Sequence, residues 1–348
     1  MLYQLKKNTK IITFEDEKKN EHIKFVFNAV FMVSCFICIM QTIFRAPMYF
    51  FIDSMSNQPY YFYVKTLFYL IFSGLSVFIP FFIYNKALDK KVKILFKKEH
   101  LKIPLAYYIL GIIAVTGIGI FIYKLSTDLT VYMKTLGFIL NEEYPPLGKN
   151  IFEQLYFIIL SAVIPALLNE ITFRGIIVEN LKKESYTASI IISSMIFSFN
   201  NISFELIPYL FVTGLILGWL YIKTDSIYIT LFAHITLNIA LSILWLFRNT
   251  ATEEYLLIIS NFIIPIAGII GVLSLIILII KYKFSKERTE PGLTTAETVK
   301  GVLISAGLWF FLFITVFQIF LRYVDKPTKE DEDITNETKV VYYIDNEI

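Results

Sequence analysis

The chain has 348 residues, of which 56% are hydrophobic, 17% are aromatic and only 18% are charged, with a formal net charge of +3. A soluble domain carries roughly 25% charged residues, and the charges here cluster between long apolar runs, which excludes a soluble globular protein. The composition therefore predicts an all-α fold, a polytopic bundle of transmembrane helices whose first partner is membrane lipid.

A helix that spans a bilayer needs about 20 apolar residues, and this length predicts eight or nine spans. The arm before Phe25 is charged and the first apolar run has no small-residue cleavage pattern behind it, so we expect an uncleaved signal anchor. The span Thr187–Phe199 is short enough to stop part-way through the bilayer. In chain order the predicted spans are Phe25–Phe44, Tyr61–Tyr84, Pro104–Tyr123, Ile151–Val178, Thr187–Phe199, Leu206–Ile222, Ile227–Phe247, Tyr255–Ile280 and Val302–Leu321.

Two connecting regions are long. Thr127–Asn150 separates the first three spans from the rest, and its stretch Leu129–Leu140 is expected to form either a short amphipathic helix in the membrane interface or a plain loop. The charged tail Asp325–Ile348 is expected to be solvated. Its segment Val340–Ile344 is expected either to form one strand or to remain irregular.

Basic residues concentrate in alternate connections, and such residues favour the cytoplasmic side of a membrane. This pattern places the N-terminus in the cytoplasm and, with nine spans, the C-terminus outside. The basic residues are Lys6, Lys7, Lys10, Lys18, Lys19 and Lys24, then Lys86, Lys90, Lys91, Lys93, Lys97, Lys98 and Lys102, then Lys182, Lys183 and Lys223, and then Lys281, Lys283, Lys286 and Arg288. Aromatic residues expected in interfacial belts are Tyr60, Tyr61, Tyr63, Trp219, Tyr221, Tyr228 and Trp245.

The fourth predicted span contains ionisable residues, which are costly inside a membrane and suggest a functional site. Glu170 and Arg174 are four residues apart, so they share one helix face and are expected to form an ion pair, whereas Asn169 is turned about 100° away. Pro165 frees a backbone carbonyl one turn earlier and predicts a bend. A structural salt bridge, with Arg174 reaching towards the interface, is the alternative interpretation.

Two later segments also carry polar side chains. Asn200 and Asn201 end the fifth predicted span, where a helix cap and turn is the simpler interpretation. His234 and Asn238 are again four residues apart inside an apolar run, so both are expected to face the bundle interior. This pair favours a polar site over a lone packing histidine.

A metal or redox centre is not expected. Cys35 and Cys38 form a C-x-x-C pattern inside an apolar span, where they are expected to be small core residues. Only His234 of the three histidines lies in an apolar run, so a zinc site with two or three histidine ligands cannot form within the bilayer. We expect no cofactor, no metal and no nucleic-acid partner.

The order and spacing of these three segments, over about residues 150–245, resemble the CAAX-processing and bacteriocin-processing (CPBP) intramembrane proteases. The family pattern is E-E-x-x-x-R, then F-x-x-x-H, then H-x-x-x-N/D. In this chain it becomes Asn169-Glu170-x-x-x-Arg174, Phe197-x-x-x-Asn201 and His234-x-x-x-Asn238. Glu170, Arg174, His234 and Asn238 match the pattern, and Asn169 and Asn201 depart from it.

The two departures fall on the groups that the resemblance assigns to water activation. In the family the first glutamate activates water with the help of the second-motif histidine, while the last pair binds the oxyanion. Asn169 cannot take a proton from water because an amide has no basic form near neutral pH. Losing a general base typically costs about 10²–10⁴-fold in rate, and Glu170 points away and is held charged by Arg174. The resemblance therefore implies a catalytically degenerate protein.

Three functions follow from these observations. The first is a membrane scaffold or regulatory partner of a membrane or cell-envelope protein, with bacteriocin immunity as one form. The second is an active intramembrane endopeptidase for prenylated proteins, leader peptides or bacteriocin-like peptides, with Glu170 or a partner's residue as the base. The third is a transporter or channel component, although the internal repeats that transporters often show are not evident.

The resemblance also divides the chain. Residues 150–245 are expected to enclose a cavity that opens to the cytoplasmic side, because Glu170 and His234 lie near the cytoplasmic ends of their predicted helices. Composition suits a bacterial plasma membrane, with an endoplasmic-reticulum protein as the alternative. The three expected regions are 1–145, an N-terminal arm with three spans; 150–245, the CPBP-like core; and 250–348, two spans with an acidic tail.

Overall fold

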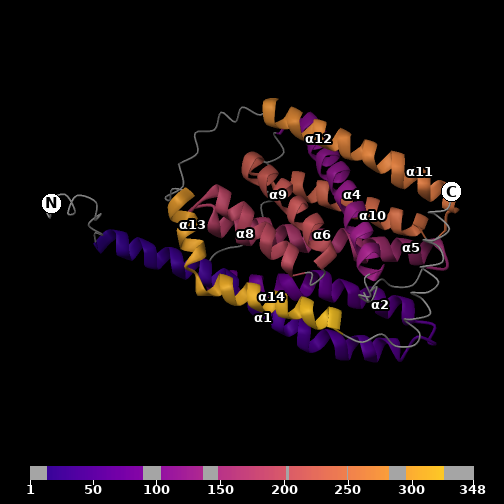
Figure 1. Ribbon diagram of the computed structural model, residues 1–348, viewed down its shortest axis with the longest axis horizontal. Helices are drawn as coiled ribbons and strands as arrows, with labels where there is room; N and C mark the ends of the chain where they lie inside the picture. Colours follow the sequence, from indigo (N-terminus) through magenta and orange to yellow (C-terminus); the bar gives the residue numbers. More distant parts are fainter. Residues whose placement is uncertain are drawn as a thin grey trace.

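The computed structural model describes residues 14–88, 103–135, 148–200, 204–248, 250–281 and 295–324, and all regular structure in these ranges is helical (Figure 1). Two shorter apolar helices, Tyr186–Phe199 and Ala306–Phe320, accompany six helices that are long and apolar enough to cross a membrane. These six are Lys24–Phe44, Leu105–Met133, Ile151–Leu181, Phe204–Thr224, Ile227–Arg248 and Glu253–Lys281. The predicted all-α, multi-pass membrane fold is confirmed. The expected tail strand lies outside the described residues.

The N-terminal helices differ from the prediction in their length. The predicted interface segment Leu129–Leu140 begins inside the third of these helices, which continues past Tyr123 to Thr135, so its described part is neither a loop nor a separate helix. An ion pair of 2.6 Å between Lys124 and Asp128, one turn apart, supports this extension. The elements are α1 (Phe14–Asp53), α2 (Tyr61–Leu70), the π-helical turn η2 (Ile71–Leu75), α3 (Ser76–Ala87) and α4 (Leu105–Thr135).

A helical run with two π-helical segments follows. The turn η4 ends two residues before Pro165, which has no N–H to continue the α-helical hydrogen-bond ladder. The distortion expected at this proline therefore takes the form of a wider turn. The second segment, η5, carries Arg174. The run consists of α5 (Ile151–Ile158), η4 (Ile159–Val163), α6 (Ile164–Glu170), η5 (Ile171–Val178) and α7 (Glu179–Leu181).

Three helices and a short 3₁₀ turn complete the centre of the bundle. α8 and α9 approach closely at Gly214, where an added Cβ atom would lie 3.0 Å from the Ser194 backbone. α9 ends at Asp225, which adopts a left-handed conformation with φ 51° and lets the chain turn directly into the next helix. The elements are α8 (Tyr186–Phe199), η6 (Phe204–Leu206), α9 (Ile207–Thr224) and α10 (Ile227–Arg248).

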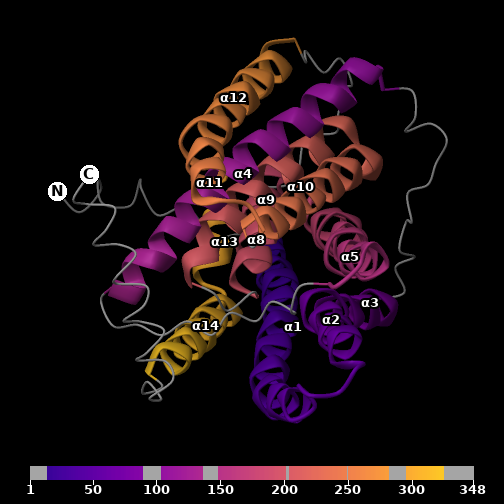
Figure 2. The ribbon, with the colours of Figure 1, turned by 90° about the vertical axis from the view of Figure 1, so that its right-hand side faces the viewer.

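The C-terminal helices cover two sides of the bundle. α12 lies along α4, and α14 lies beside α1, in both views (Figures 1 and 2). The predicted span Val302–Leu321 is interrupted, because the helix ends at Leu303 and a new helix begins at Ala306. Between them, the hydroxyl of Ser305 donates to Asn28 Oδ1 of α1 at 2.8 Å. The elements are α11 (Glu253–Ile258), η7 (Ile259–Ile263), α12 (Ile264–Lys281), α13 (Thr295–Leu303) and α14 (Ala306–Val324).

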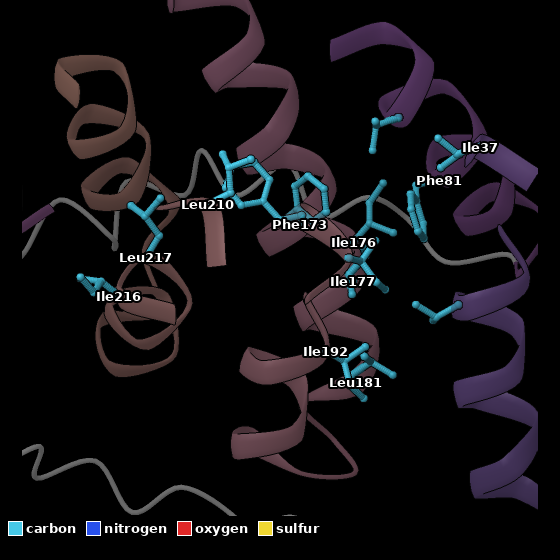
Figure 3. Close-up of a cluster of buried hydrophobic side chains, with 14 of the residues drawn as sticks. Ile37, Phe81, Phe173, Ile176, Ile177, Leu181, Ile192, Leu210, Ile216 and Leu217 are labelled. Atoms are coloured by element: carbon cyan, nitrogen blue, oxygen red, sulfur yellow. The ribbon is translucent and has the colours of Figure 1, made fainter. Parts of the chain in front are cut away.

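The run η5 occupies the centre of the hydrophobic core. In Figure 3 its residues Phe173, Ile176 and Ile177 lie between Phe81 on one side and Leu217 on the other. Each of these five side chains is almost completely buried. The face of η5 that carries the ionic residue Arg174 is therefore held rigidly by packing on both flanks. Cys35 and Cys38 of α1 are buried and unbridged.

Candidate functional site

Three ionisable side chains from two helices meet inside the bundle. Arg174 Nη1 donates to Glu170 Oε1 at 3.1 Å, and His234 Nδ1 contacts the same oxygen at 2.8 Å. Their exposed fractions are 0% for Glu170, 1% for Arg174 and 3% for His234. The four-residue spacing places Glu170 and Arg174 on one face of the α6–η5 run, and α10 supplies the histidine. The expected neighbourhood of carboxylate, guanidinium and imidazole is present.

Arg174 has two further contacts besides its ion pair with Glu170. Its Nη2 atom donates to the Gly214 carbonyl of α9 at 3.1 Å, and its guanidinium carbon lies 5.7 Å from the centre of the Phe197 ring. A cation above an aromatic face is attracted by the ring's quadrupole. The Phe197 ring also stands edge-on to His234 at 5.8 Å. Arg174 therefore does not extend to the membrane interface, so that part of the alternative interpretation is wrong.

The contact with Glu170 defines the hydrogen-bonding state of His234. A carboxylate paired with arginine only accepts hydrogen bonds, so the 2.8 Å contact requires a proton on Nδ1. In the neutral imidazole, the second nitrogen Nε2 is then an acceptor; it becomes a donor only when the ring is charged. An oxyanion-binding role needs the charged ring, whereas a proton-accepting role needs the neutral one.

A cavity of about 130 Å³ lies beside this ionic cluster. Neither Glu170 nor Arg174 lines it, so the ion pair lies behind the cavity wall. His234 both lines the cavity and contacts Glu170. The polar lining residues are Asn169, His234, Asn238, Ser161 and Ser242, and the aromatic ones are Tyr69, Tyr123, Phe157, Phe197, Tyr209 and Trp245. The space is sufficient for several water molecules, with polar partners to hold them.

The two amides of the site have different roles. Asn169 lines the cavity although the adjacent Glu170 points into the ionic cluster, as the 100° step between successive helical residues requires. Asn238 Nδ2 donates to the Ala162 carbonyl of η4 at 3.2 Å and so ties α10 to the α5–α6 run. One of the two N–H groups of Asn238 is thus committed to the fold.

The second-motif position Asn201 lies outside the described residues. Its neighbour Asn200 is buried at the C-terminal end of α8, where Oδ1 accepts a hydrogen bond of 3.4 Å from Cys38 Sγ of α1. Asn200 therefore ends the helix, as the simpler interpretation expected, and also joins α8 to α1.

The expected direction of the cavity is wrong. Its lining residues lie at one end of the bundle: Phe157 in the first part of the α5–α7 run, Leu206 just before α9 and Trp245 near the end of α10. Lys182 and Lys223 lie at the opposite ends of the corresponding helices. The cavity thus extends from His234 away from the lysine-rich turns. The prediction was based on the positions of Glu170 and His234 near the lysine-rich ends of their helices. The other lining residues on these two helices, however, lie towards the opposite ends.

Several cavity residues were not identified from the sequence. Ser242 and Trp245 follow Asn238 at four and seven residues on the same face of α10, a spacing that continues the His234 pair, but Trp245 was assigned to an interfacial belt. Tyr69 and Tyr123 belong to helices outside residues 150–245, and no local pattern relates them to the site. Another residue assigned to a belt is Tyr221, but it is fully buried and its hydroxyl donates to Glu179 at 2.5 Å.

In the part of the chain that the structure describes, no three histidine, cysteine, aspartate or glutamate side chains converge in a way that could hold a metal ion. The polar groups that line the cavity are the amides of Asn169 and Asn238, the imidazole of His234, the indole of Trp245 and five hydroxyl-bearing residues, and a buried ion pair lies behind the imidazole. The hydroxyls belong to Ser161, Ser242, Tyr69, Tyr123 and Tyr209.

Residues 151–240 match the family model described as type II CAAX prenyl endopeptidase Rce1-like. The match covers about a quarter of the chain and contains Glu170, Arg174, His234 and Asn238. No curated protein and no solved structure matches the chain.

Proposed function

We propose that this chain, a CAAX-protease-like membrane protein with an Rce1-like domain at residues 151–240, binds a peptide segment of a membrane or cell-envelope partner in its cavity without hydrolysing it. It acts as a scaffold or regulatory partner. Residues 150–245 form the core of this function, and residues 1–145 and 250–348 flank it. We place the protein in a plasma membrane, most naturally a bacterial one.

One observation supports the absence of hydrolysis above all. The side chain beside the cavity at the water-activating position is Asn169, and the neighbouring carboxylate Glu170 lies outside the lining, ion-paired to Arg174 at 3.1 Å. A general base must reach the proton that it abstracts, directly or through one water. Glu170 is directed at Arg174 and His234, and Asn169 has no basic form.

The same geometry favours peptide binding. Amide and hydroxyl groups pair well with the C=O and N–H of a peptide bond, and the aromatic residues of the lining offer apolar contact to adjoining side chains. An asparagine in place of a glutamate at position 169 removes the general base but leaves the hydrogen-bonding and the apolar contacts in place. The cavity can therefore bind a peptide without hydrolysing it.

A second candidate function is endopeptidase activity with a different base. His234 lines the cavity and its Nδ1 is bonded to Glu170, so in the neutral ring Nε2 is an acceptor. In this mechanism Nε2 takes a proton from water as the water oxygen attacks the peptide carbonyl carbon. The same proton then passes to the leaving nitrogen as the C–N bond breaks. Glu170 stabilises the imidazolium that forms in between.

Restoring the altered positions tests the proposal. We expect the purified protein in lipid nanodiscs to leave CAAX-type and leader peptides intact in a mass-spectrometric assay. The double variant Asn169→Glu/Asn201→His is expected to generate products, because it supplies both proton-handling groups. The matched control adds His234→Ala to that variant and should remove the gain. Cleavage by the unmodified protein, with no increase in the double variant, would refute the proposal and favour the second candidate.

A further inference from the structure

The cavity and the basic turns lie at opposite ends of the helices that form the site. Along the α5–α7 run the lining residues extend from Asn169 back to Phe157, whereas Lys182 and Lys183 follow the other end of the same run. In Figure 1, α5 and α11 lie at the right, far from α13 at the left. The end of the bundle to which the cavity extends is therefore the one where α5 starts.

Positive charge assigns a side of the membrane to each end. Lysines cluster around the turn between α7 and α8 and the turn between α9 and α10, and further lysines follow α3 and α12. Cytoplasmic connections carry such an excess of lysine and arginine. The ends where α5, α9 and α11 begin carry fewer basic residues, so the cavity extends towards the extracytoplasmic surface.

The lining of the cavity selects against charge. None of the described residues that line it is a lysine, arginine, aspartate or glutamate. The ionic pair Glu170–Arg174 is closed on itself behind the histidine. His234, the imidazole of the lining, is already paired with Glu170 through Nδ1. A charged ligand group would lose its hydration and find no unpaired counter-ion, whereas a neutral amide would find partners in Asn169, Asn238 and Ser242.

From these observations we propose that the cavity takes up an uncharged, extended peptide segment from the extracytoplasmic side of the membrane. The ligand class rests on the proposed peptide-binding function; the side of entry does not. The partner is thus a secreted or membrane-anchored polypeptide outside the cytoplasm, because a cytoplasmic chain would have to cross the bilayer to reach the site.

Cysteine labelling from each side of the membrane tests the side of entry. In a background with Cys35→Ala and Cys38→Ser, single cysteines are introduced as Ser242→Cys or Ser161→Cys in the cavity lining. Two exposed positions mark the two surfaces: Lys149→Cys before α5 and Lys183→Cys after α7. An uncharged, membrane-impermeant thiol reagent, a sugar-linked maleimide, is applied to right-side-out and to inverted vesicles.

We expect the cavity cysteines to react in the same vesicles as Lys149→Cys. Reaction in the same vesicles as Lys183→Cys, or in neither preparation, would overturn the side of entry. This result is independent of any peptidase activity, so it separates a failure of this inference from a failure of the proposed function.

The ligand class is tested by protection in the same vesicles. An N-acetylated, C-amidated pentapeptide of alanine and leucine is expected to slow the labelling of Ser242→Cys at least severalfold. The same peptide with a central aspartate or lysine is expected to have little effect. Equal protection by all three peptides, or protection by none, would overturn the assignment of an uncharged peptide.

Discussion

Replacing Glu170 by glutamine removes the anion that pairs with Arg174 but keeps an oxygen that accepts from His234. Among the described residues, the Arg174 guanidinium then keeps two contacts, the Gly214 carbonyl at 3.1 Å and the Phe197 ring at 5.7 Å. The exposed fraction of Arg174 is only 1%, so water cannot replace the lost anion. Breaking a buried pair by removing one partner costs roughly 3–5 kcal/mol, because the remaining charge is left unpaired. At about 1.4 kcal/mol per factor of ten, the equilibrium constant for folding falls about a hundredfold to several thousandfold.

The assay is reversible unfolding in mixed detergent micelles, followed by tryptophan fluorescence. Glu170→Gln and Arg174→Met should each lower the free energy of unfolding by several kcal/mol, about 3–5 on the scale for a broken buried pair. The double variant Glu170→Gln/Arg174→Met should lose much less than the sum of the two single variants, because no uncompensated charge remains. Glu253→Gln, at an exposed position on α11, is the matched control and should change stability by less than about 0.5 kcal/mol. Single variants as stable as the control, or a double variant that loses the full sum, would refute this account of the ion pair.

Three further predictions concern helix packing and turns, and each is measured by the same unfolding assay. Gly271→Ala should lower the free energy of unfolding by roughly 1–3 kcal/mol, because its Cβ would lie 2.7 Å from a backbone nitrogen of α4. Gly175→Ala, whose Cβ meets nothing nearer than 3.9 Å, should be neutral or stabilising by up to about 1 kcal/mol. Equal effects of the two variants would contradict the close approach of α12 to α4. Asn238→Leu should cost about 0.6–2 kcal/mol through its lost hydrogen bond to η4, and no loss would argue against that tie. Asp225→Val should lower the free energy of unfolding by about 1–2 kcal/mol because of the positive φ. Asp225→Gly should be near neutral, since it loses only a part-exposed ion pair with Lys182. A valine variant more stable than the glycine variant would contradict the left-handed turn.

The positions that were predictable from sequence are those set by local helical spacing. Glu170, Arg174 and Asn169 point where the 3.6-residue period sends them, and His234 meets the carboxylate because buried ionisable groups in a membrane need partners. Apolar length predicted eight or nine spans, and the described residues contain six helices long and apolar enough to cross a membrane and two shorter apolar helices.

Features that depend on packing between distant helices were not predictable. Tyr69 and Tyr123 reach the cavity only because α2 and α4 lie against the core. The π-helical segment η5 also has no simple sequence signal, although η4 could be associated with Pro165. The direction of the cavity depends on which side chains leave space unfilled, and this is a property of the assembled bundle.

Hydrolysis in water enriched in ¹⁸O tests the central claim most directly. The purified protein and its His234→Ala variant are incubated with CAAX-type and leader peptides, and mass spectrometry follows the appearance of ¹⁸O in any new carboxyl group. A binding protein without a general base predicts that both proteins incorporate label only at the uncatalysed rate. Incorporation by the unmodified protein about 10²-fold or more above the variant, the size of a working base, would contradict the account and establish an active endopeptidase.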